Sequence, residues 1–300
     1  MGEPLTPGPT RIILDTDLAM GAPGSDIDDG FALALALADP GLRVEVVTTV
    51  GGNSDVVTST RLTHQLLAVL GRTDVPVVQG LPADEDAATE IVRRVLAEPG
   101  ELTLVTIGPL TNVAKALEIE PAVATAVREI VVMGGVYLEQ TNVAAMPGEY
   151  NFWCDPPAAQ AVMESGARLR LVGLDVTRRV RLSRDDAERL ADGGAFGRLA
   201  SEHTLAWIAF QERVKPREEI EQGSCALHDP LAVAVVSRPD LVTWRDAHVD
   251  VETEGRFTRG VAVADLLMWE DPPAPNARIA TAVDAEAFRA LFVERMAGLP

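Results

Sequence analysis

Five aspartates lie within fifteen residues near the start of the chain: Asp15, Asp17, Asp26, Asp28 and Asp29. The first two follow the apolar run 11–14, which predicts a buried strand. Carboxylates gathered at the end of a buried strand repel one another, and their pKa values rise unless a cation neutralises them. An all-oxygen site of this kind suits a hard divalent cation, and Ca²⁺ accepts several carboxylates with looser geometry than Mg²⁺. We therefore predict a Ca²⁺ site in this loop; the alternative is a solvated acidic turn that caps a helix beginning near Asp28.

A histidine–aspartate pair lies much later, in the segment Leu-His-Asp-Pro (227–230), directly before the apolar run 231–236. Asp229 stands where a helix N-cap is expected, and Pro230 occupies the first helical position. A capped helix would explain this arrangement without any chemistry. In the functional interpretation, His228 donates a proton or contacts a substrate hydroxyl, because the unperturbed pKa of histidine lies close to neutral pH.

Amides, a carboxylate and aromatic rings are interleaved in the segment Gly-Glu-Tyr-Asn-Phe-Trp (148–153), and Asn142 precedes it. Hydrogen-bonding groups would suit the hydroxyls of a sugar, and ring faces would suit a nitrogen base. A packed loop would explain this cluster equally well. Asn53 follows two glycines at the end of another predicted strand, where it either reaches a ligand or belongs to a plain turn.

The elements that must position these residues alternate between short β-rich runs and helical patterns. Predicted strands cover residues 11–14, 44–49, 75–78, 102–107, 129–133 and 169–174, and predicted helices cover 31–38, 56–70, 87–97, 203–214, 229–236 and 285–296. This alternation predicts an α/β fold, a single domain with a mostly parallel central sheet flanked by helices. Right-handed crossovers bring the carboxyl ends of the strands to one edge, where we expect the active site.

The remaining bulk properties limit the classes of partner. The formal charge is −19, from 45 acidic and 26 basic residues, which disfavours binding to nucleic acid or anionic membranes, although acidity also serves solubility. No apolar run approaches the roughly 20 residues of a membrane span, and no signal peptide is visible. We therefore expect a cytoplasmic protein with one domain over residues 1–300, of which the Pro- and Gly-rich residues 1–10 are flexible.

Taken together, the motifs resemble those of the inosine–uridine-preferring nucleoside hydrolase family, which has a Rossmann-like fold. The motifs that carry the resemblance, over about residues 11–240, are Asp-Thr-Asp (15–17) with Asp-Asp (28–29), Thr-Val-Gly-Gly-Asn (49–53), Ile-Gly-Pro-Leu-Thr-Asn (107–112), Val-Val-Met-Gly-Gly (131–135), Glu-Tyr-Asn-Phe-Trp-Cys-Asp-Pro (149–156), Leu-Asp-Val-Thr (174–177) and His-Asp-Pro-Leu-Ala-Val (228–233). Each motif alone is modest, whereas the full set in this order is specific.

The resemblance implies that the protein cleaves the N-glycosidic bond of a ribonucleoside with water activated by Ca²⁺. The implied metal ligands are Asp17, Asp29, the backbone carbonyl of Val132 and Asp229. Asp17 would also accept a proton from the attacking water, and His228 would face the base or the ribose as the candidate acid. The implied ribose contacts are Asp28, Asn53, Asn142, Glu149, Tyr150 and Asn151. A homo-oligomer, either a dimer or a tetramer, is implied as well.

Two departures from the family pattern leave the identity of the base open. Residues 18–27 make the acidic loop longer than in many members, and Leu-Pro-Ala-Asp (81–84) stands where members often carry a His-Gly motif. A predicted helix ending near Lys215 carries His203, Trp207 and Gln211, which either contact the base or, for Trp207, belong to the core at helical spacing.

Three alternatives remain beside a common nucleoside hydrolase. One is a hydrolase of a non-standard N-riboside, and another is a catalytically weak, Ca²⁺-dependent riboside-binding protein. The third is a phosphatase that forms an aspartyl-phosphate at the Asp-Thr-Asp loop. That chemistry needs a lysine at the site, and the two lysines, Lys115 and Lys215, lie in a predicted helix and a charged surface run.

Overall fold

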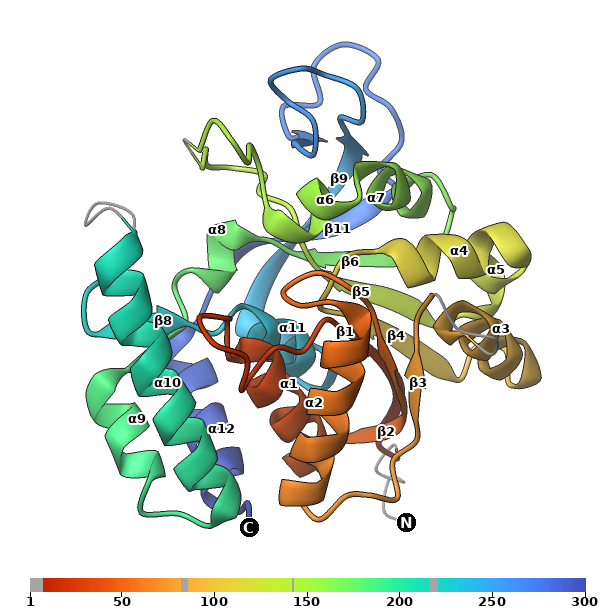
Figure 1. Ribbon diagram of the computed structural model, residues 1–300. Coiled ribbons are helices and arrows are strands. Elements are labelled where there is room, and N and C mark those ends of the chain that lie inside the picture. Colours follow the sequence, from red (N-terminus) through yellow and green to blue (C-terminus); the bar gives the residue numbers. More distant parts are fainter. Residues whose placement is uncertain (1–7, 82–85, 142, 216–220) are drawn as a thin grey trace, which may run out of the picture.

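Strand β1 (Thr10–Thr16) lies inside a large sheet because its apolar residues are buried on both faces. It pairs in parallel with β2 (Leu42–Thr49) on one side and β4 (Leu102–Thr106) on the other. The computed structural model describes residues 8–81, 86–141, 143–215 and 221–300. Within these ranges the main sheet has nine strands in the order β10-β9-β11-β6-β5-β4-β1-β2-β3 (Figure 1).

The other strands extend this sheet, except for a separate antiparallel pair formed by β7 and β8. Their bounds are β3 Val77–Gln79, β5 Glu129–Met133, β6 Leu169–Val172, β7 Arg181–Ser183, β8 Ser224–Ala226, β9 Val242–Val251, β10 Ala262–Asp265 and β11 Ala277–Val283. The run from β3 to β11 is parallel throughout, and β9 is antiparallel to both of its neighbours. This arrangement confirms the predicted α/β fold with a mostly parallel central sheet.

Helices cover both faces of the sheet. Their bounds are α1 Asp28–Ala38, α2 Val56–Val69, α3 Ala87–Ala97, α4 Thr111–Ile119, α5 Val123–Ala126, α6 Tyr150–Cys154, α7 Pro156–Met163, α8 Leu174–Thr177, α9 Arg184–Leu190, α10 Ala195–Val214, α11 His228–Ser237 and α12 Ala285–Ala297, with a short 3₁₀ turn, η1, at Pro239–Leu241. Ile12 and Leu14 join one core cluster with α1, α10, α11 and α12, whereas Ile13 joins a second one with α3, α4 and α7. The alternation of side chains along β1 therefore supplies both cores.

The predicted and observed elements differ in several places. The strand predicted at 169–174 ends at Val172, because Leu174 begins helix α8. Helix α10 begins at Ala195, eight residues before the predicted start, and packs beside α9 and α12 at one side of the molecule (Figure 1). Near the end of the chain, where the sequence indicates only a short β-like stretch before the last helix, the structure has three strands, β9, β10 and β11. Residues 1–7 of the segment predicted to be flexible lie outside the described residues, and Thr10 already belongs to β1.

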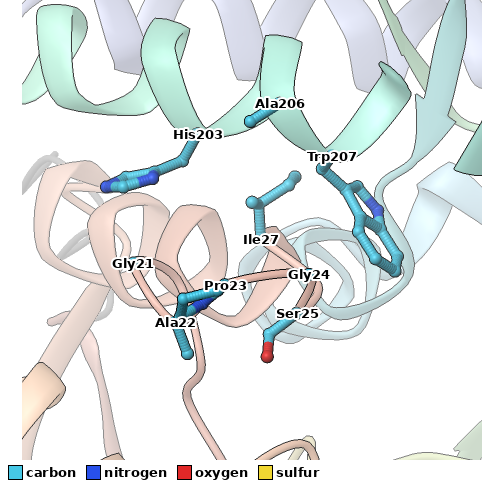
Figure 2. Close-up of a pocket in the computed structure, with 9 residues that line it drawn as sticks. All are labelled: Gly21, Ala22, Pro23, Gly24, Ser25, Ile27, His203, Ala206 and Trp207. Carbon is cyan, nitrogen blue, oxygen red and sulfur yellow. The ribbon is translucent and has the colours of Figure 1, made fainter. Parts of the chain in front are cut away.

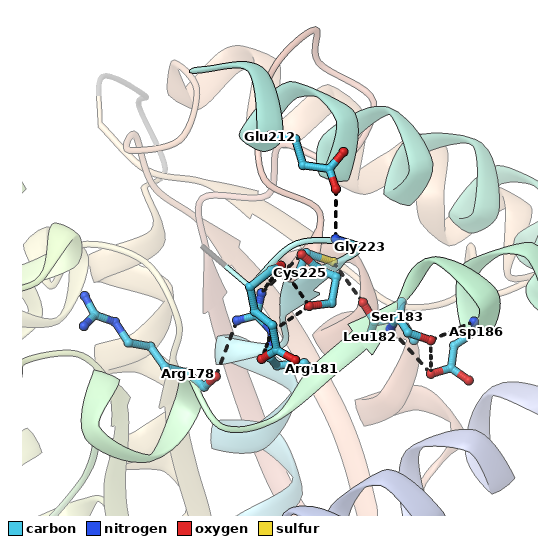
Figure 3. A network of polar contacts seen from close by, with 10 residues as sticks. Arg178, Arg181, Leu182, Ser183, Asp186, Glu212, Gly223 and Cys225 are labelled. Carbon is cyan, nitrogen blue, oxygen red and sulfur yellow. Dashed lines mark hydrogen bonds and ion pairs between the residues drawn. The ribbon is translucent and has the colours of Figure 1, made fainter. Parts of the chain in front are cut away.

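The β7–β8 pair anchors the segment that leads into α11 (Figure 3). Arg181 donates from Nε to Ser224 Oγ at 2.8 Å, and the Gly223 amide donates to Glu212 of α10 at 2.8 Å. Ser183 caps α9 through a reciprocal pair of hydrogen bonds with Asp186. These contacts fix the chain just before the His-Asp-Pro motif. In the described part of the chain, every helix is too short or too polar to span a bilayer.

Candidate active site

The carboxyl end of β1 carries two buried aspartates with different surroundings. Asp15 accepts hydrogen bonds from Thr48 Oγ1 at 2.5 Å and from Asn112 Nδ2 at 2.8 Å. Asn112 also donates to the backbone carbonyl of Thr49 at 3.0 Å. Asp15 therefore ties β1 to β2 and to the start of α4. Burial raises its pKa to about 6, against the effect of these two hydrogen bonds.

Asp17 lies at the edge of the sheet and contacts the loop after β2. The backbone amide of Asn53 donates to Asp17 Oδ2 at 2.6 Å, and Asn53 Nδ2 donates to Asp29 Oδ2 at 3.2 Å. Thr16 Oγ1 donates to the other oxygen of Asp29. Asp17 Oδ1 is buried and has no hydrogen-bond partner among the described residues. One oxygen of Asp17 is thus held by the protein, and the other is available to a ligand.

Glycines make room for the Asp17 carboxylate on two sides. A Cβ atom on Gly52 would lie 2.1 Å from Asp17 Oδ2, and one on Gly108 would lie 2.9 Å from Asp17 Oδ1. These distances are shorter than non-bonded contacts, so any larger residue at either position would displace the carboxylate or the loop. The two glycines therefore allow the backbone of these loops to lie close to the Asp17 carboxylate.

Three further carboxylates converge from the first turns of two helices. Asp28 and Asp29 begin α1, and Asp229 is the second residue of α11, which packs against α1. One oxygen from each of the three lies within 4.8 Å of the others, and all three side chains are buried. The Asp229 amide also donates to Asp28 Oδ2 at 3.2 Å. Helix N-termini favour negative charge, which lowers the cost of placing these carboxylates in the first turns of α1 and α11.

The cluster carries more negative charge than its surroundings neutralise. Burial is the largest cause that raises the pKa of Asp17, to about 7, and the charge of Asp28 adds to it. Burial followed by neighbouring carboxylates raises the pKa values of Asp28, Asp29 and Asp229 well above the usual range. Within the described residues, no lysine, arginine or histidine forms an ion pair with any of these four side chains. A buried set of oxygens with no counter-charge fits a hard divalent cation.

The remaining predicted metal ligand, Val132, is the fourth residue of β5. It pairs with Thr106 of β4 and Leu171 of β6, and its side chain belongs to the core. A metal bound at this residue would therefore contact the backbone carbonyl and not the side chain. Asp28, predicted as a ribose contact, lies together with the predicted ligands Asp29 and Asp229.

Glu149 and Asn151 hold the start of α6 against the ends of β4 and β5. Glu149 caps the helix and accepts hydrogen bonds from the amides of Asn151, Phe152 and Gly135 at 2.8, 3.2 and 3.1 Å. Asn151 Nδ2 donates to the carbonyls of Ile107 and Met133 at 3.1 and 3.0 Å. Burial raises the pKa of Glu149 to about 7. Much of the hydrogen-bonding capacity of both side chains is thus used within the protein, which leaves carboxylate lone pairs and the Asn151 carbonyl for a ligand.

Tyr150 joins α6 to the loop after β2. Its hydroxyl donates to the Gly52 carbonyl at 2.9 Å, and its ring stacks on Trp153 with centroids 6.3 Å apart. Tyr150 therefore lies near the loop that holds Asp17. Asn142, predicted to contact ribose, lies outside the described residues, as do residues 82–84 of the segment that replaces the His-Gly motif.

His228 begins α11 and is only partly exposed. Its Nδ1 atom lies 2.7 Å from Thr177 Oγ1 of α8. Burial lowers the pKa of His228 to about 3, with smaller contributions from Lys215, Arg178 and Arg181. The imidazole is accordingly neutral at pH 7 without a bound cation, so hydrogen bonding rather than proton donation is the chemistry it offers in that state.

A hollow of about 220 Å³ lies between the long loop after Asp17 and helix α10 (Figure 2). Its lining includes Gly24 and Ile27 from the loop and His203 and Trp207 from the helix. Trp207 is 9% exposed and stacks on Phe210 with centroids 5.6 Å apart, as the core interpretation predicted. Only an edge of this ring is therefore open to the hollow, while the rest packs in the core.

Sequence reasoning gave no role to several residues that support the site. Thr48, Asn112 and Thr177 contact Asp15 or His228 through side chains from elements distant in sequence. Asn112 lies inside a quoted motif, but its partner is 97 residues away. The sequence offers one signal for such residues, because the carboxyl ends of parallel strands lie side by side. This signal predicts that residues following the strands are close together, but it does not predict their individual hydrogen bonds.

Comparison with known proteins agrees with this geometry. The family model described as inosine-uridine preferring nucleoside hydrolase matches residues 12–290. The pyrimidine-specific ribonucleoside hydrolase RihA of Salmonella newport is 33% identical over 90% of this chain and 94% of its own length. An uncharacterized protein of Schizosaccharomyces pombe is 32% identical over 97% of this chain and 100% of its own length.

Two solved structures extend the comparison to the fold. A plant nucleoside hydrolase superimposes with a TM-score of 0.86 at 28% identity, over 97% of this chain and 99% of that chain. A purine-preferring ribonucleoside hydrolase from Gardnerella vaginalis gives a TM-score of 0.85 at 29% identity, over 96% and 98%. The match of the family model over nearly the whole length, together with these relatives, shows that the chain belongs to the inosine–uridine-preferring nucleoside hydrolase family.

Proposed function

We propose that this protein hydrolyses the N-glycosidic bond of ribonucleosides at a Ca²⁺ site formed by Asp17, Asp29, Asp229 and the carbonyl of Val132. The observation that carries the proposal is the meeting of three buried carboxylates within 4.8 Å, with Asp17 beside them and no ion pair from any of the four to a cationic side chain in the described part of the chain. Ca²⁺ accommodates several carboxylates and a backbone carbonyl in flexible geometry, whereas Mg²⁺ demands a near-ideal octahedron.

Asp17 is the proposed general base. Its Oδ2 atom is held by the Asn53 amide, which leaves the buried Oδ1 atom to accept a proton from the attacking water. The bound cation would supply a lowered pKa for that water and a fixed point for the ribose diol. Asp28 shares the cluster and faces the same position from the first turn of α1, so we propose that it binds a ribose hydroxyl.

The other side of the sugar would contact α6 and the loop after β2. We assign ribose hydroxyls to Asn53, Asn142, Glu149 and Asn151, with Tyr150 packed against the sugar. N-glycosidic cleavage builds positive charge on the ribose, as in other reactions with an oxocarbenium-like transition state. Carboxylates that the fold holds in place before the reaction stabilise that positive charge, because they need not move as the charge develops.

The identity of the base is a separate question. One relative is described as pyrimidine-specific and one structural neighbour as purine-preferring, so the family relationship allows both. The hollow beside the long loop and α10 offers the edge of Trp207 and the imidazole of His203 (Figure 2). We propose a ribonucleoside as the substrate and leave its base to the assay below.

The proposal is tested by the release of reducing sugar from inosine, adenosine, guanosine, uridine and cytidine, each with Ca²⁺ and with chelator. We expect release that the chelator abolishes and that Ca²⁺ restores. The control variant Asp39→Asn should behave like the wild type in this assay, because Asp39 is a buried aspartate at the opposite end of α1 from the site. Bound Ca²⁺ without release from any nucleoside would favour a non-standard N-riboside or a binding protein, and release that is insensitive to chelator would refute the metal site.

A further inference from the structure

Helix α8, the Leu-Asp-Val-Thr segment, contacts the site but receives no role from the mechanism above. Thr177 is fully buried, and its Oγ1 atom lies 2.7 Å from Nδ1 of His228. Among the described residues, the Nε2 atom of His228 has no hydrogen-bond partner. The His228 side chain as a whole is half-buried. The protein therefore holds one ring nitrogen and leaves the other without a hydrogen bond to the described residues.

The turn that carries Thr177 is itself held firmly. The carboxylate of Asp175 accepts hydrogen bonds from the amides of Tyr137, Leu138 and Glu139 at 2.7, 2.9 and 3.0 Å. The Leu174 amide donates to the carbonyl of Gly135 at 2.9 Å. Gly135 in turn donates to Glu149, so α8 is tied to the proposed sugar side of the site as well as to His228.

We propose that Thr177 is a positioning residue that fixes the plane and tautomer of His228, so that Nε2 is the nitrogen presented to the departing base. This inference rests on the proposed function. A hydroxyl that donates to Nδ1 leaves a proton on Nε2, and the neutral ring then donates a hydrogen bond to the base as the glycosidic bond breaks. The base leaves with the electron pair of the glycosidic bond and takes its proton from bulk water, so the protonation state of the ring is unchanged by the step.

The physical reason is geometric. An imidazole attached at the start of a helix has two rotatable side-chain bonds, and it must point one nitrogen at a base whose position the ribose contacts determine. A buried hydroxyl on a rigid turn removes that freedom before the substrate binds, and misplacement of a catalytic group by about 1 Å can cost on the order of 10²-fold in rate. Hydrogen-bond partners that orient metal-ligating histidines have comparable effects, about 10- to 100-fold when they are removed.

The test compares Thr177→Val, which keeps the shape and removes the hydroxyl, with Thr177→Ser, which keeps the hydroxyl. We expect kcat on the preferred nucleoside to fall about tenfold or more in the valine variant, with KM nearly unchanged, and to stay near the wild-type value in the serine variant. With p-nitrophenyl riboside, whose phenolate leaves without a hydrogen-bond donor, the valine variant should match the wild type. Thr103→Val is the matched control, because Thr103 is buried and its hydroxyl has no partner among the described residues.

Two readouts separate positioning from a merely structural role. In a His228→Gln background, Thr177→Val should cause no further loss, because the residue acts through the ring that is already absent. The ¹⁵N signals of His228, one of only four histidines, should report a changed or mixed tautomer in the valine variant. Thr177→Ala provides the same comparison if the valine variant does not fold.

Equal loss on both substrates, additive losses in the double variant, or full activity of Thr177→Val would each overturn the inference. If the wild type hydrolyses no riboside, the proposed function fails. The ¹⁵N signals then decide whether Thr177 positions the ring of His228. Identical His228 signals in the wild type and in Thr177→Val would show that Thr177 does not position the ring. A changed tautomer would show that it does.

Discussion

The substitution Asp229→Asn should have opposite effects with and without Ca²⁺. Asparagine keeps the shape of the side chain and removes one of the charges that converge within 4.8 Å. In chelator, the folded-state pKa of Asp229 lies well above its unfolded value, mainly through burial and then through the charge of Asp28. A carboxyl with a raised folded-state pKa costs stability as the pH rises above its unfolded pKa. The metal-free asparagine variant should therefore unfold at the same temperature as the wild type or a higher one at pH 8, and this advantage should vanish near pH 4.

With Ca²⁺ the order should reverse. A ligand at a hundred times its dissociation constant stabilises the folded state by about 2.7 kcal/mol. For a chain of 300 residues, with an unfolding entropy of about 2.1 cal/mol/K per residue, that corresponds to a rise in Tm of about 4 °C. The variant lacks a ligand carboxylate, so its Tm should rise by less than about 1 °C under the same conditions.

The assay is thermal unfolding followed by circular dichroism, at pH 4 and pH 8, in chelator and in Ca²⁺. Asp39→Asn serves as the control and should keep the full Ca²⁺ response, because Asp39 accepts its hydrogen bonds from Gly41 and Ser237, outside the site. An equal Ca²⁺ response in Asp229→Asn and the wild type would refute the assignment of Asp229 as a ligand. Lower stability of the metal-free variant at pH 8 would refute the argument from charge repulsion.

Three further predictions concern Asp17, its glycine neighbour and the pH dependence of stability. Asp17→Asn should lower kcat by about 10²-fold or more through loss of the general base, with Tm maintained; steady-state kinetics showing wild-type kcat would remove Asp17 from that role. Gly52→Ala should lower kcat and cost about 1–3 kcal/mol in the free energy of unfolding, because its Cβ atom would lie 2.1 Å from Asp17 Oδ2. Gly51→Ala, whose Cβ atom would meet nothing closer than 3.8 Å, should be tolerated, and equal denaturant midpoints for the two variants would contradict the steric argument. In chelator, Tm should fall as the pH rises toward about 7, because Asp17 and Glu149 have folded-state pKa values raised to that value by burial. Ca²⁺ should reduce this fall in Tm. A Tm that rises over the same pH interval would contradict the predicted direction of the pH dependence.

The order of motifs along the chain determined much of the fold and the type of site. Apolar runs alternating with helical patterns predicted the parallel sheet, because buried strands and crossover helices have different hydrophobic periods. Parallel crossovers bring the ends of strands together, so the aspartates after β1 and Asn53 after β2 were expected at one edge, and they contact each other there. These inferences depend on local pattern and on the handedness of connections, both of which a sequence contains.

Only the tertiary structure decided which carboxylates meet. Asp15 and Asp17 look alike in sequence, and each keeps one buried oxygen without a partner among the described residues. They differ in their neighbours: Asp15 accepts hydrogen bonds from Thr48 and Asn112, whereas Asp17 accepts one from the Asn53 amide and lies close enough to Asp28 for that charge to raise its pKa. Asp229 reaches Asp28 across 201 residues because α11 packs against α1. The contact between Thr177 and His228 likewise depends on where α8 lies beside α11. Side-chain environment and pKa depend on packing between distant elements, and local sequence patterns do not encode that packing residue by residue.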